Sequence, residues 1–294
     1  MNTIISRQTA AGLLPTRPRD GHKGTFGHTF VIAGSRRYPG AMRLTCEAAS
    51  RSGVGLVTAG IPRSLADVAA MALLECMSLP LPDTAGGVLG HDALELALPF
   101  SADKESVVLG PGLSTELETR RFVHALVPRI TSPLVIDADG LNLLAVEVSI
   151  LAGRKPCSTI LTPHPGEMAR LSGLDTRGVQ AQREAIAQEF AAAHQVVVVL
   201  KGHETVVASP DGAVAVNSTG NNGMATGGTG DVLAGLLGGL LAQGMPTWDA
   251  ARLGVWLHGY AGDCAAQQFT ARAMIARDVI ACIPQAFAAL VVSE

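Results

Sequence analysis

A glycine-rich segment that ends in an acidic residue is the part of the sequence best suited to chemistry. Gly227-Gly228-Thr229-Gly230-Asp231 precedes the apolar run at residues 232–237, which predicts a helix. Small residues let backbone N–H groups point inward, and a helix N-terminus adds unpaired donors and a positive dipole end. A carboxylate beside such an anion site can accept a proton while the backbone neutralises a transferring phosphoryl group. We predict an anion hole at Gly228, Thr229 and Gly230 with Asp231 as catalytic base; the alternative is that Asp231 only caps the helix.

Two basic side chains follow predicted strands. Lys201 comes directly after four valines and a leucine, and His164 stands between two prolines just after the run at residues 159–162. The carboxyl ends of parallel strands are where open α/β sheets bind ligands. Lysine is also scarce in this chain, which favours a binding role for Lys201 over a solvent-exposed one. The alternative for His164 is that it caps a turn.

The common nucleotide and hydrolase fingerprints are absent from the sequence. The first predicted strand leads into residues 34–40, whose spacing does not match G-x-G-x-x-G, and no Gly-Lys-Ser/Thr occurs. The motifs G-x-S-x-G and H-E-x-x-H are missing as well. Hydride transfer on a Rossmann site, P-loop hydrolysis, nucleophile-elbow chemistry and zincin chemistry therefore lose support.

The elements that must position these residues alternate along the chain. Short β-branched runs alternate with segments of helical periodicity, which predicts an α/β fold of three layers with a central, mostly parallel sheet. From Asp231 on the pattern is helical, and no linker divides the chain, so we expect a single domain over residues 1–294 with residues 1–20 as a short leader. The predicted strands are residues 29–33, 56–60, 106–109, 134–137, 159–162 and 196–200, with a hairpin of 205–208 and 213–216. The predicted helices before residue 200 include 41–52, 115–127 and 179–194.

Composition and charge exclude several classes of protein. The net charge is −3 and the sequence has no basic stripe, so we expect no nucleic-acid partner. The longest apolar run, residues 232–242, is far shorter than the ~20 residues that a membrane span needs. The five cysteines include no C-x-x-C pair, which speaks against a disulfide framework and a zinc site and favours a cytoplasmic location. The 33 glycines in 294 residues exceed the usual ~7 % and are consistent with nucleotide binding.

Six motifs in order carry a family resemblance that runs from about His22 to the last predicted helices. The sequence resembles the ribokinase-like superfamily and, within it, the ADP- or ATP-dependent NAD(P)H-hydrate dehydratases. Ser114 and Asn222 stand where relatives more often have glycine and proline, which affects loop geometry more than chemistry. Besides the glycine-rich segment, the motifs are His22-Lys23-Gly24-Thr25-Phe26-Gly27, Gly110-Pro111-Gly112-Leu113, Asp137-Ala138-Asp139-Gly140-Leu141-Asn142, Thr162-Pro163-His164-Pro165-Gly166-Glu167 and Lys201-Gly202-His203-Glu204-Thr205.

The resemblance implies a ribokinase-like fold and a repair reaction. The substrate would be the S form of hydrated NADH or NADPH, whose nicotinamide ring has gained water at C6. Water is a poor leaving group, and the family phosphorylates the hydroxyl so that phosphate can depart. With ADP as donor and Mg²⁺ as cofactor, the products would be the reduced dinucleotide, AMP and phosphate. We therefore expect a hydro-lyase that depends on ADP.

The resemblance also implies roles for individual residues. Asp231 would take the proton from the C6 hydroxyl, and Gly230 would hold the phosphate of the donor. The nucleotide would be lined by Lys201, Gly202, His203, Glu204 and Thr205, and the hydrated dinucleotide by Ala41, Gly112, His164 and Asp231. The metal ligands stay open, with Asp137, Asp139 and Glu167 as candidates. The alternatives are a turn cap for Asp137, an ordinary first-turn acid for Glu167 and a ligand-free tight turn for the glycines around Pro111.

Two other functions remain possible from the sequence. One is a ribokinase-like kinase acting on a hydroxymethylpyrimidine, a thiazole alcohol or a sugar, which would share the Gly-Asp segment. The other is a nucleotide-sensing subunit without catalysis. In many bacterial relatives an epimerase domain precedes this domain, and because the short leader leaves no room for one, we expect a separate epimerase in the same pathway. The resemblance further implies a homo-oligomer, namely a tetramer.

Overall fold

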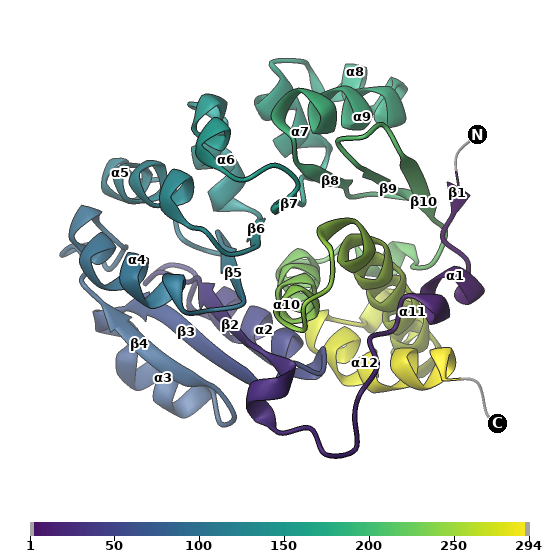
Figure 1. The fold of residues 1–294 in the computed structure, drawn as a ribbon, viewed down its shortest axis with the longest axis horizontal. Helices are drawn as coiled ribbons and strands as arrows, with labels where there is room; N and C mark the ends of the chain where they lie inside the picture. Colours follow the sequence, from purple (N-terminus) through teal and green to yellow (C-terminus); the bar gives the residue numbers. More distant parts are fainter. Residues whose placement is uncertain (1–2, 292–294) are drawn as a thin grey trace.

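A sheet of ten strands runs through the computed structural model, which describes residues 3–291 (Figure 1). The strand order is β1-β10-β9-β8-β7-β6-β5-β2-β3-β4. Strand β9 is antiparallel to both of its neighbours, whereas every other adjacent pair is parallel. The prediction of a mostly parallel sheet is therefore confirmed. The strands are β1 Thr3–Ile4, β2 His28–Ile32, β3 Leu56–Pro62, β4 Met77–Leu81, β5 Ser106–Leu109, β6 Leu134–Ile136, β7 Thr159–Leu161, β8 Val197–Leu200, β9 Thr205–Ala208 and β10 Val214–Asn217.

The central strands are buried on both faces, as their apolar sequences predict. Successive residues of a strand point to opposite faces, so each central strand contributes side chains to the apolar clusters on both faces of the sheet. In β5, Val108 joins the apolar cluster on one face of the sheet, whereas Val107 and Leu109 join the cluster on the other. The predicted three-layer architecture is confirmed.

Helices cover both faces of this sheet, as Figure 1 shows. Helices α1 Arg7–Gly12, α2 Pro39–Arg51, α3 Ala66–Ala72, α10 Thr229–Ala242, α11 Thr247–Ala273 and α12 Ala276–Leu290 pack on one face. Helices α4 Leu94–Ala102, α5 Leu117–Leu126, α6 Asp139–Leu144, α7 Pro165–Ser172, α8 Thr176–Ala181 and α9 Arg183–His194 pack on the other. No helix among residues 3–291 is long and apolar enough to cross a membrane.

Helix α10 is the buried centre of its layer. Beyond its first turn it is apolar all round, as expected for a helix enclosed by other elements, and it packs closely on α2. Glycine permits this approach, because a Cβ at Gly235 would lie 2.0 Å from the carbonyl oxygen of Thr45. The N-terminus of α10, which carries the predicted anion hole, is thus held at a fixed place against the sheet.

Three parts of the sequence prediction differ from the structure. The segment 179–194 forms two helices, because Gln182 between α8 and α9 has non-helical dihedral angles (φ −139°, ψ 43°). Strands β1 and β4 were not predicted, and both lie at edges of the sheet. Strand β4 contains Pro80 and exposes its first residues, so it shows none of the buried apolar pattern that marks a central strand.

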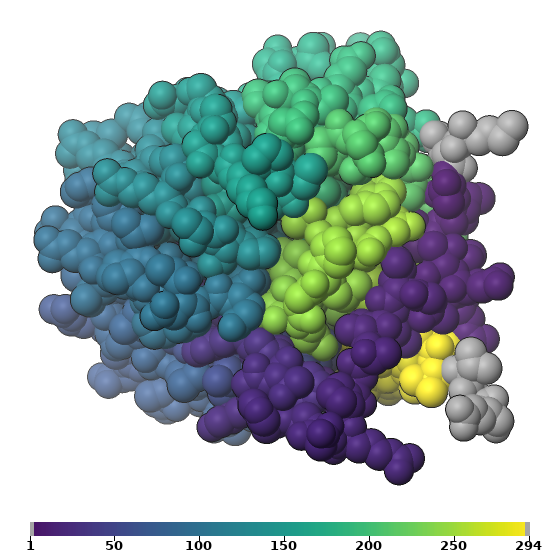
Figure 2. Space-filling view, in the orientation of Figure 1, coloured from purple at the N-terminus to yellow at the C-terminus, as the bar shows by residue number. Residues whose placement is uncertain are grey.

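The segment predicted as a leader packs on the domain. Strand β1 pairs with β10, and Ile5 and Ala10 are buried. The Arg7 side chain donates to the carbonyl of Ala289 near the end of α12. In the space-filling view this N-terminal segment lies against the C-terminal helices (Figure 2). Residues 3–12 therefore contribute to the folded core.

A topological switch point lies between β2 and β5. The chain proceeds from β2 outward to β3 and β4, and then returns to β5 on the other side of β2. At this point the loops after the two strands diverge, and open α/β sheets bind ligands in the resulting crevice. The loops are joined where Gly34 N donates to the Pro111 carbonyl oxygen at 2.8 Å.

Candidate active site

A cavity of about 820 Å³ opens where the carboxyl ends of β6, β7 and β8 face the N-terminus of α10. The described residues around it include all members of the Gly227–Asp231 segment and of the Lys201–Thr205 motif. His164, Glu167 and Asp137 line it as well. The fold thus brings together four motifs that are far apart in the sequence.

The partly buried Lys201 and the buried Asp137 form an ion pair in the lining of this cavity. Lys201 Nζ donates to Asp137 Oδ1 at 2.6 Å and lies 3.8 Å from Glu167 Oε2. Burial opposes the charged form of the lysine, but the carboxylates of Asp137 and Glu167 outweigh it and raise the pKa of Lys201. Thr162 Oγ1 donates to the same Asp137 oxygen at 2.7 Å. Lys201 is therefore a fixed cation, and the idea that Asp137 caps the next helix is wrong, since its side chain bonds Lys201 and Thr162 instead.

The N-terminus of α10 leaves its backbone donors available. Its N-cap is Gly228, with φ of +93° and no side-chain cap. A Cβ built on Gly230 would lie 3.2 Å from Lys201 Nζ and 3.5 Å from Asp137 Oδ2, so this glycine lies directly beside the ion pair. Free N–H groups next to an ammonium make an anion site. This geometry supports the predicted anion hole.

Asp231 lies on the first turn of α10 and faces the same cavity. Because Gly228 occupies the N-cap, the alternative that Asp231 is the cap is wrong. Burial, together with repulsion from Asp137, raises the pKa of Asp231 to about 7, although Lys201 acts in the opposite direction. A carboxylate that titrates near neutral pH is well matched to accepting a proton from a hydroxyl.

His164 and Glu167 have a structural role besides their place at the cavity. His164 Nδ1 accepts from the backbone N–H groups of Gly166 and Glu167, and Glu167 Oε2 accepts from His164 N at 2.8 Å. This is a capping box on α7, so His164 does cap the turn, and Glu167 lies in the first helical turn as the buried partner of that cap rather than as an ordinary first-turn acid. Burial raises the pKa of Glu167 to about 6. The pair holds the strand-end turn that lines the cavity.

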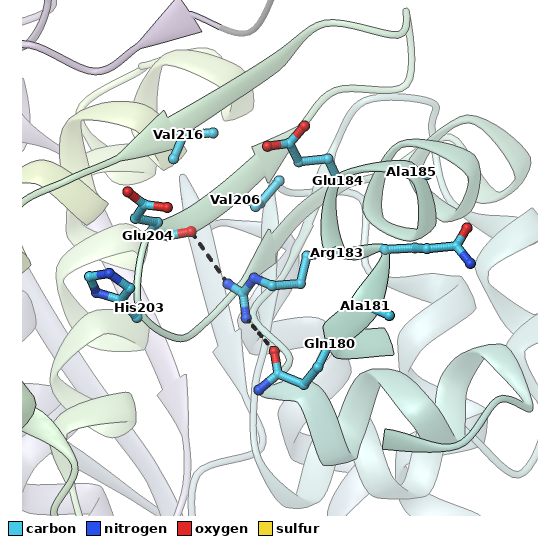
Figure 3. Close-up of a pocket in the computed structure, with 10 residues that line it drawn as sticks. Gln180, Ala181, Arg183, Glu184, Ala185, His203, Glu204, Val206 and Val216 are labelled. Carbon is cyan, nitrogen blue, oxygen red and sulfur yellow. Dashed lines mark hydrogen bonds between the residues drawn. The ribbon is translucent and has the colours of Figure 1, made fainter. Parts of the chain in front are cut away.

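The Lys201–Thr205 motif forms a tight turn supported by Arg183. Gly202 and Glu204 have positive φ values of +142° and +55°. The Arg183 guanidinium donates to the carbonyls of Leu200, Lys201 and Glu204 and to the Gln180 side chain, as Figure 3 shows in part. The sequence analysis missed Arg183, because its contacts depend on how α9 packs beside β8. His203 and Glu204 of the turn separate the main cavity from the smaller one drawn in Figure 3.

Ala41 and Gly112 meet at the switch point rather than in the cavity. A Cβ built on Gly112 would lie 2.8 Å from Ala41 Cβ, so the two residues are neighbours. Gly112 has φ of +64°, and Gly110 approaches the Asp137 carbonyl so closely that a Cβ would lie 1.9 Å from it. The tight turn predicted around Pro111 is therefore real. Neither Ala41 nor Gly112 borders the 820 Å³ cavity, whereas His164 and Asp231 do.

Known proteins are similar to this chain in sequence and in architecture. The NAD(P)H-hydrate dehydratase family matches residues 29–285. The chain belongs to this family. A bifunctional NAD(P)H-hydrate repair enzyme of Moorella thermoacetica is 46 % identical over 92 % of the chain, which covers 51 % of that protein. An ADP-dependent (S)-NAD(P)H-hydrate dehydratase of Neisseria meningitidis serogroup B is 40 % identical over 84 % of the chain and 80 % of its own length. The chain thus spans about half the length of the bifunctional relative.

A solved structure supports the same assignment. The ADP/ATP-dependent NAD(P)H-hydrate dehydratase of Bacillus subtilis, co-crystallised with ATP and Mg²⁺, superposes with a TM-score of 0.82 at 28 % identity. The match covers 98 % of this dehydratase-family chain and 99 % of the Bacillus protein. The predicted ribokinase-like fold is therefore confirmed.

This family member has one carboxylate oxygen suited to a cation. Asp137 Oδ2 is buried and has no hydrogen-bond partner, and it lies beside Gly230 at the anion hole. Asp139 is directed elsewhere, since its Oδ2 accepts from Ser114 N at 2.9 Å. Residues 3–291 contain no group of three or more His, Cys, Asp or Glu side chains that could hold a metal. Mg²⁺ commonly takes one or two carboxylates and completes its shell with phosphate oxygens and water, so the donor set fits it.

Residues 217–224 of this dehydratase-family chain form one wall of the cavity and are anchored on α11. Asp263 accepts from Gly220 N and from Asn221 Nδ2, both at 2.9 Å. Thr219 Oγ1 lies 3.1 Å from the Trp256 carbonyl oxygen. The sequence analysis missed Asp263, because nothing in its local pattern marks a partner some forty residues away. These bonds make a preformed wall for a ligand.

Proposed function

We propose that the chain catalyses the dehydration of the S form of hydrated NADH and NADPH, with ADP as phosphoryl donor and AMP and phosphate as the other products. The observation that carries this proposal is the site itself. A carboxylate whose pKa is raised to about 7 lies beside an uncapped helix N-terminus and a partly buried lysine in a cavity large enough for a nucleotide. Family membership and the activity for which the Neisseria relative is named support dehydratase chemistry over a small-molecule kinase.

The first step is phosphoryl transfer to the C6 hydroxyl. Asp231 accepts the hydroxyl proton, and the oxygen forms a bond to the β-phosphorus of ADP. The P–O bond to AMP breaks, and AMP leaves with the electron pair. Lys201 and the N–H of Gly230 stabilise charge on the transferring group. Mg²⁺, when bound with the help of Asp137, would neutralise further phosphate charge.

The second step is elimination of phosphate. The lone pair of the ring nitrogen moves toward C6, the C6–O bond breaks, and phosphate departs with the bonding electrons. Transfer of a proton from C5 to the departing phosphate then restores the double bond of the reduced nicotinamide. The switch-point loops with Ala41 and Gly112, together with His164 at the cavity, would hold the dinucleotide during both steps. The nucleotide would lie along the Lys201–Thr205 turn.

The experiment that tests this function uses the purified chain with hydrated NADH, Mg²⁺ and ADP. We expect the absorbance of reduced nicotinamide to return, with one AMP and one phosphate released for each NADH formed. Parallel reactions with ATP and with hydrated NADPH measure donor and substrate preference. Absence of recovery with either donor, together with phosphorylation of a hydroxymethylpyrimidine, a thiazole alcohol or a sugar, would establish the kinase instead.

The rate should depend on pH through Asp231. Its carboxylate is the active form, and its pKa of about 7 in the ligand-free site predicts that kcat/KM rises from pH 5 to 8 and then levels off. Steady-state rates over pH 5–9 measure this rise, and its apparent pKa describes Asp231 together with the carboxylates that interact with it. Glu167→Gln removes the neighbouring titration, whose pKa is about 6, and should leave the apparent pKa of the rise near 7. A profile that is flat from pH 5 to 9 contradicts the assignment of Asp231 as base.

Other properties of the chain remain proposals from family resemblance. We infer a cytoplasmic enzyme, which the five free cysteines support. We also infer a homotetramer that acts alongside a separate epimerase. Analytical ultracentrifugation measures the oligomeric state. The rate of NADH recovery from the R form, with and without added epimerase, tests whether a separate epimerase is needed.

A further inference from the structure

A partly buried histidine contacts the backbone of the anion hole. His258 lies on α11, and its Nε2 is 2.9 Å from the carbonyl oxygen of Thr229, the first residue of α10. A carbonyl oxygen only accepts, so Nε2 carries the proton and donates it. None of the roles described above uses this histidine, although it borders the main cavity.

The bond acts on the anion hole through one peptide group. The Thr229 carbonyl and the Gly230 N–H belong to the same planar trans peptide and point in opposite directions. Fixing the carbonyl therefore fixes the direction of the N–H. The Thr229 side chain adds to this constraint, since its Oγ1 donates to the carbonyls of Met224 and Thr226 at 2.8 and 3.0 Å. A bond to the carbonyl also polarises the peptide and strengthens the N–H as a donor.

The imidazole acts as a neutral dipole. Burial lowers the pKa of His258 to about 4, and Lys201 adds to this effect, whereas the hydrogen bond to Thr229 and the charge of Asp137 oppose it. The ring is therefore uncharged at neutral pH and adds no second cation beside Lys201. Its hydrogen bond to Thr229 stays the same over the pH range in which Asp231 titrates.

We propose that His258 is a positioning residue that holds the Thr229–Gly230 peptide so that the Gly230 N–H is directed at the phosphate of the donor. The histidine acts through the backbone and contacts no reacting atom. The inference rests on the proposed function for its effect on turnover. Its effect on the peptide is independent of that function.

Three variants test the role of the hydrogen bond. His258→Phe keeps an aromatic ring but removes the donor, and should lower kcat by about 10- to 100-fold, less than complete loss of an oxyanion-hole donor. The KM for hydrated NADH should change less than about threefold, since Ala41, Gly112 and His164 are untouched. His258→Gln retains an N–H donor, so its kcat should be at least about tenfold higher than that of His258→Phe. His124→Phe is the matched control, because His124 Nε2 also bonds a main-chain carbonyl, that of Leu143, at 2.9 Å.

A spectroscopic measurement separates positioning from stability. The assigned backbone amide resonance of Gly230 in a ¹⁵N–¹H spectrum should shift in His258→Phe, return toward its original place in His258→Gln and stay unchanged in His124→Phe. If the phenylalanine variant does not fold, His258→Asn, whose shorter amide does not reach Thr229, takes its place.

Two results would overturn the inference. One is an unmoved Gly230 resonance in the variant that lacks the donor. The other is a glutamine variant as slow as the phenylalanine variant although both melt at the same temperature. If the wild-type chain does not turn over hydrated NADH, the proposed function fails, whereas the Gly230 resonance still decides whether His258 orients the peptide.

Discussion

Replacing Asp231 by Asn is expected to lower kcat by about 10³-fold, within the range that general-base catalysis contributes. The amide has nearly the same shape as the carboxylate but cannot accept the hydroxyl proton. The Lys201–Thr205 turn and the N-terminus of α10 are unchanged, so the dissociation constant for ADP should stay within about threefold. Release of AMP and phosphate measures kcat, and isothermal titration calorimetry measures the dissociation constant for ADP.

The same variant distinguishes an enzyme from a nucleotide sensor. A sensor would keep both its ligand binding and its response, whereas the enzyme keeps binding and loses turnover. Asp211→Asn is a suitable control, since Asp211 lies exposed in the β9–β10 turn and accepts from Ala213 N. It should leave kcat unchanged. An Asp231→Asn variant with more than about a tenth of the wild-type rate would contradict the role of base.

Asp231→Asn should also stabilise the fold at neutral pH. The pKa of Asp231 is about 7 in the folded chain, raised from 3.8, so the folded state holds a proton that the unfolded state has lost. Ionisation of this group therefore costs folding free energy as pH rises from about 4 to 7. The amide carries no charge and avoids this cost. We expect a higher Tm for the variant than for the wild type at pH 8 and a smaller difference at pH 4.

Replacing Lys201 by Met is expected to lower kcat by about 10²- to 10³-fold, as for loss of a group that stabilises transition-state charge. The ammonium lies beside Gly230 and 2.6 Å from Asp137 Oδ1. Its removal also leaves Asp137 buried without its cation, and breaking a buried pair costs about 3–5 kcal/mol. Both the turnover rate and the Tm should therefore fall.

A double variant separates catalysis from stability. Lys201→Met with Asp137→Asn removes both charges, so it should recover most of the lost Tm while kcat stays low. Lys104→Met is the control, because Lys104 lies on the surface over the Phe100 ring. If the double variant recovers both Tm and kcat, the ammonium of Lys201 contributes to folding and not to phosphoryl transfer.

Local features of the site could be predicted from the sequence because they depend on neighbours along the chain. The small residues of Gly227–Asp231 and the apolar helix after them indicate an anion site by themselves. The strand before Lys201 is buried on both faces because it is apolar throughout. The turn around Pro111 needs glycines whatever lies nearby, and the structure confirms their positive φ values.

The remaining features depend on contacts between distant segments. Lys201 reaches Asp137 only because β7 lies between β6 and β8, and both side chains follow carboxyl ends of these strands. The edge strands β1 and β4 carry no buried pattern of their own, so only their pairing reveals them. Arg183, His258 and Asp263 take part through helices that pack against the site, and their local sequence resembles that of any amphipathic or buried helix.

The sequence by itself determined the α/β class, the anion-hole segment, its acidic residue and the family to which the chain belongs. Only the tertiary structure decided which charges meet and how they titrate. The pKa of Asp231 depends on burial and on Asp137, Lys201, Asp139 and Glu167, all of which are remote along the chain. Electrostatic energy depends on distance in space and on exclusion of water, and both quantities are set when the sheet and helices close around the cavity.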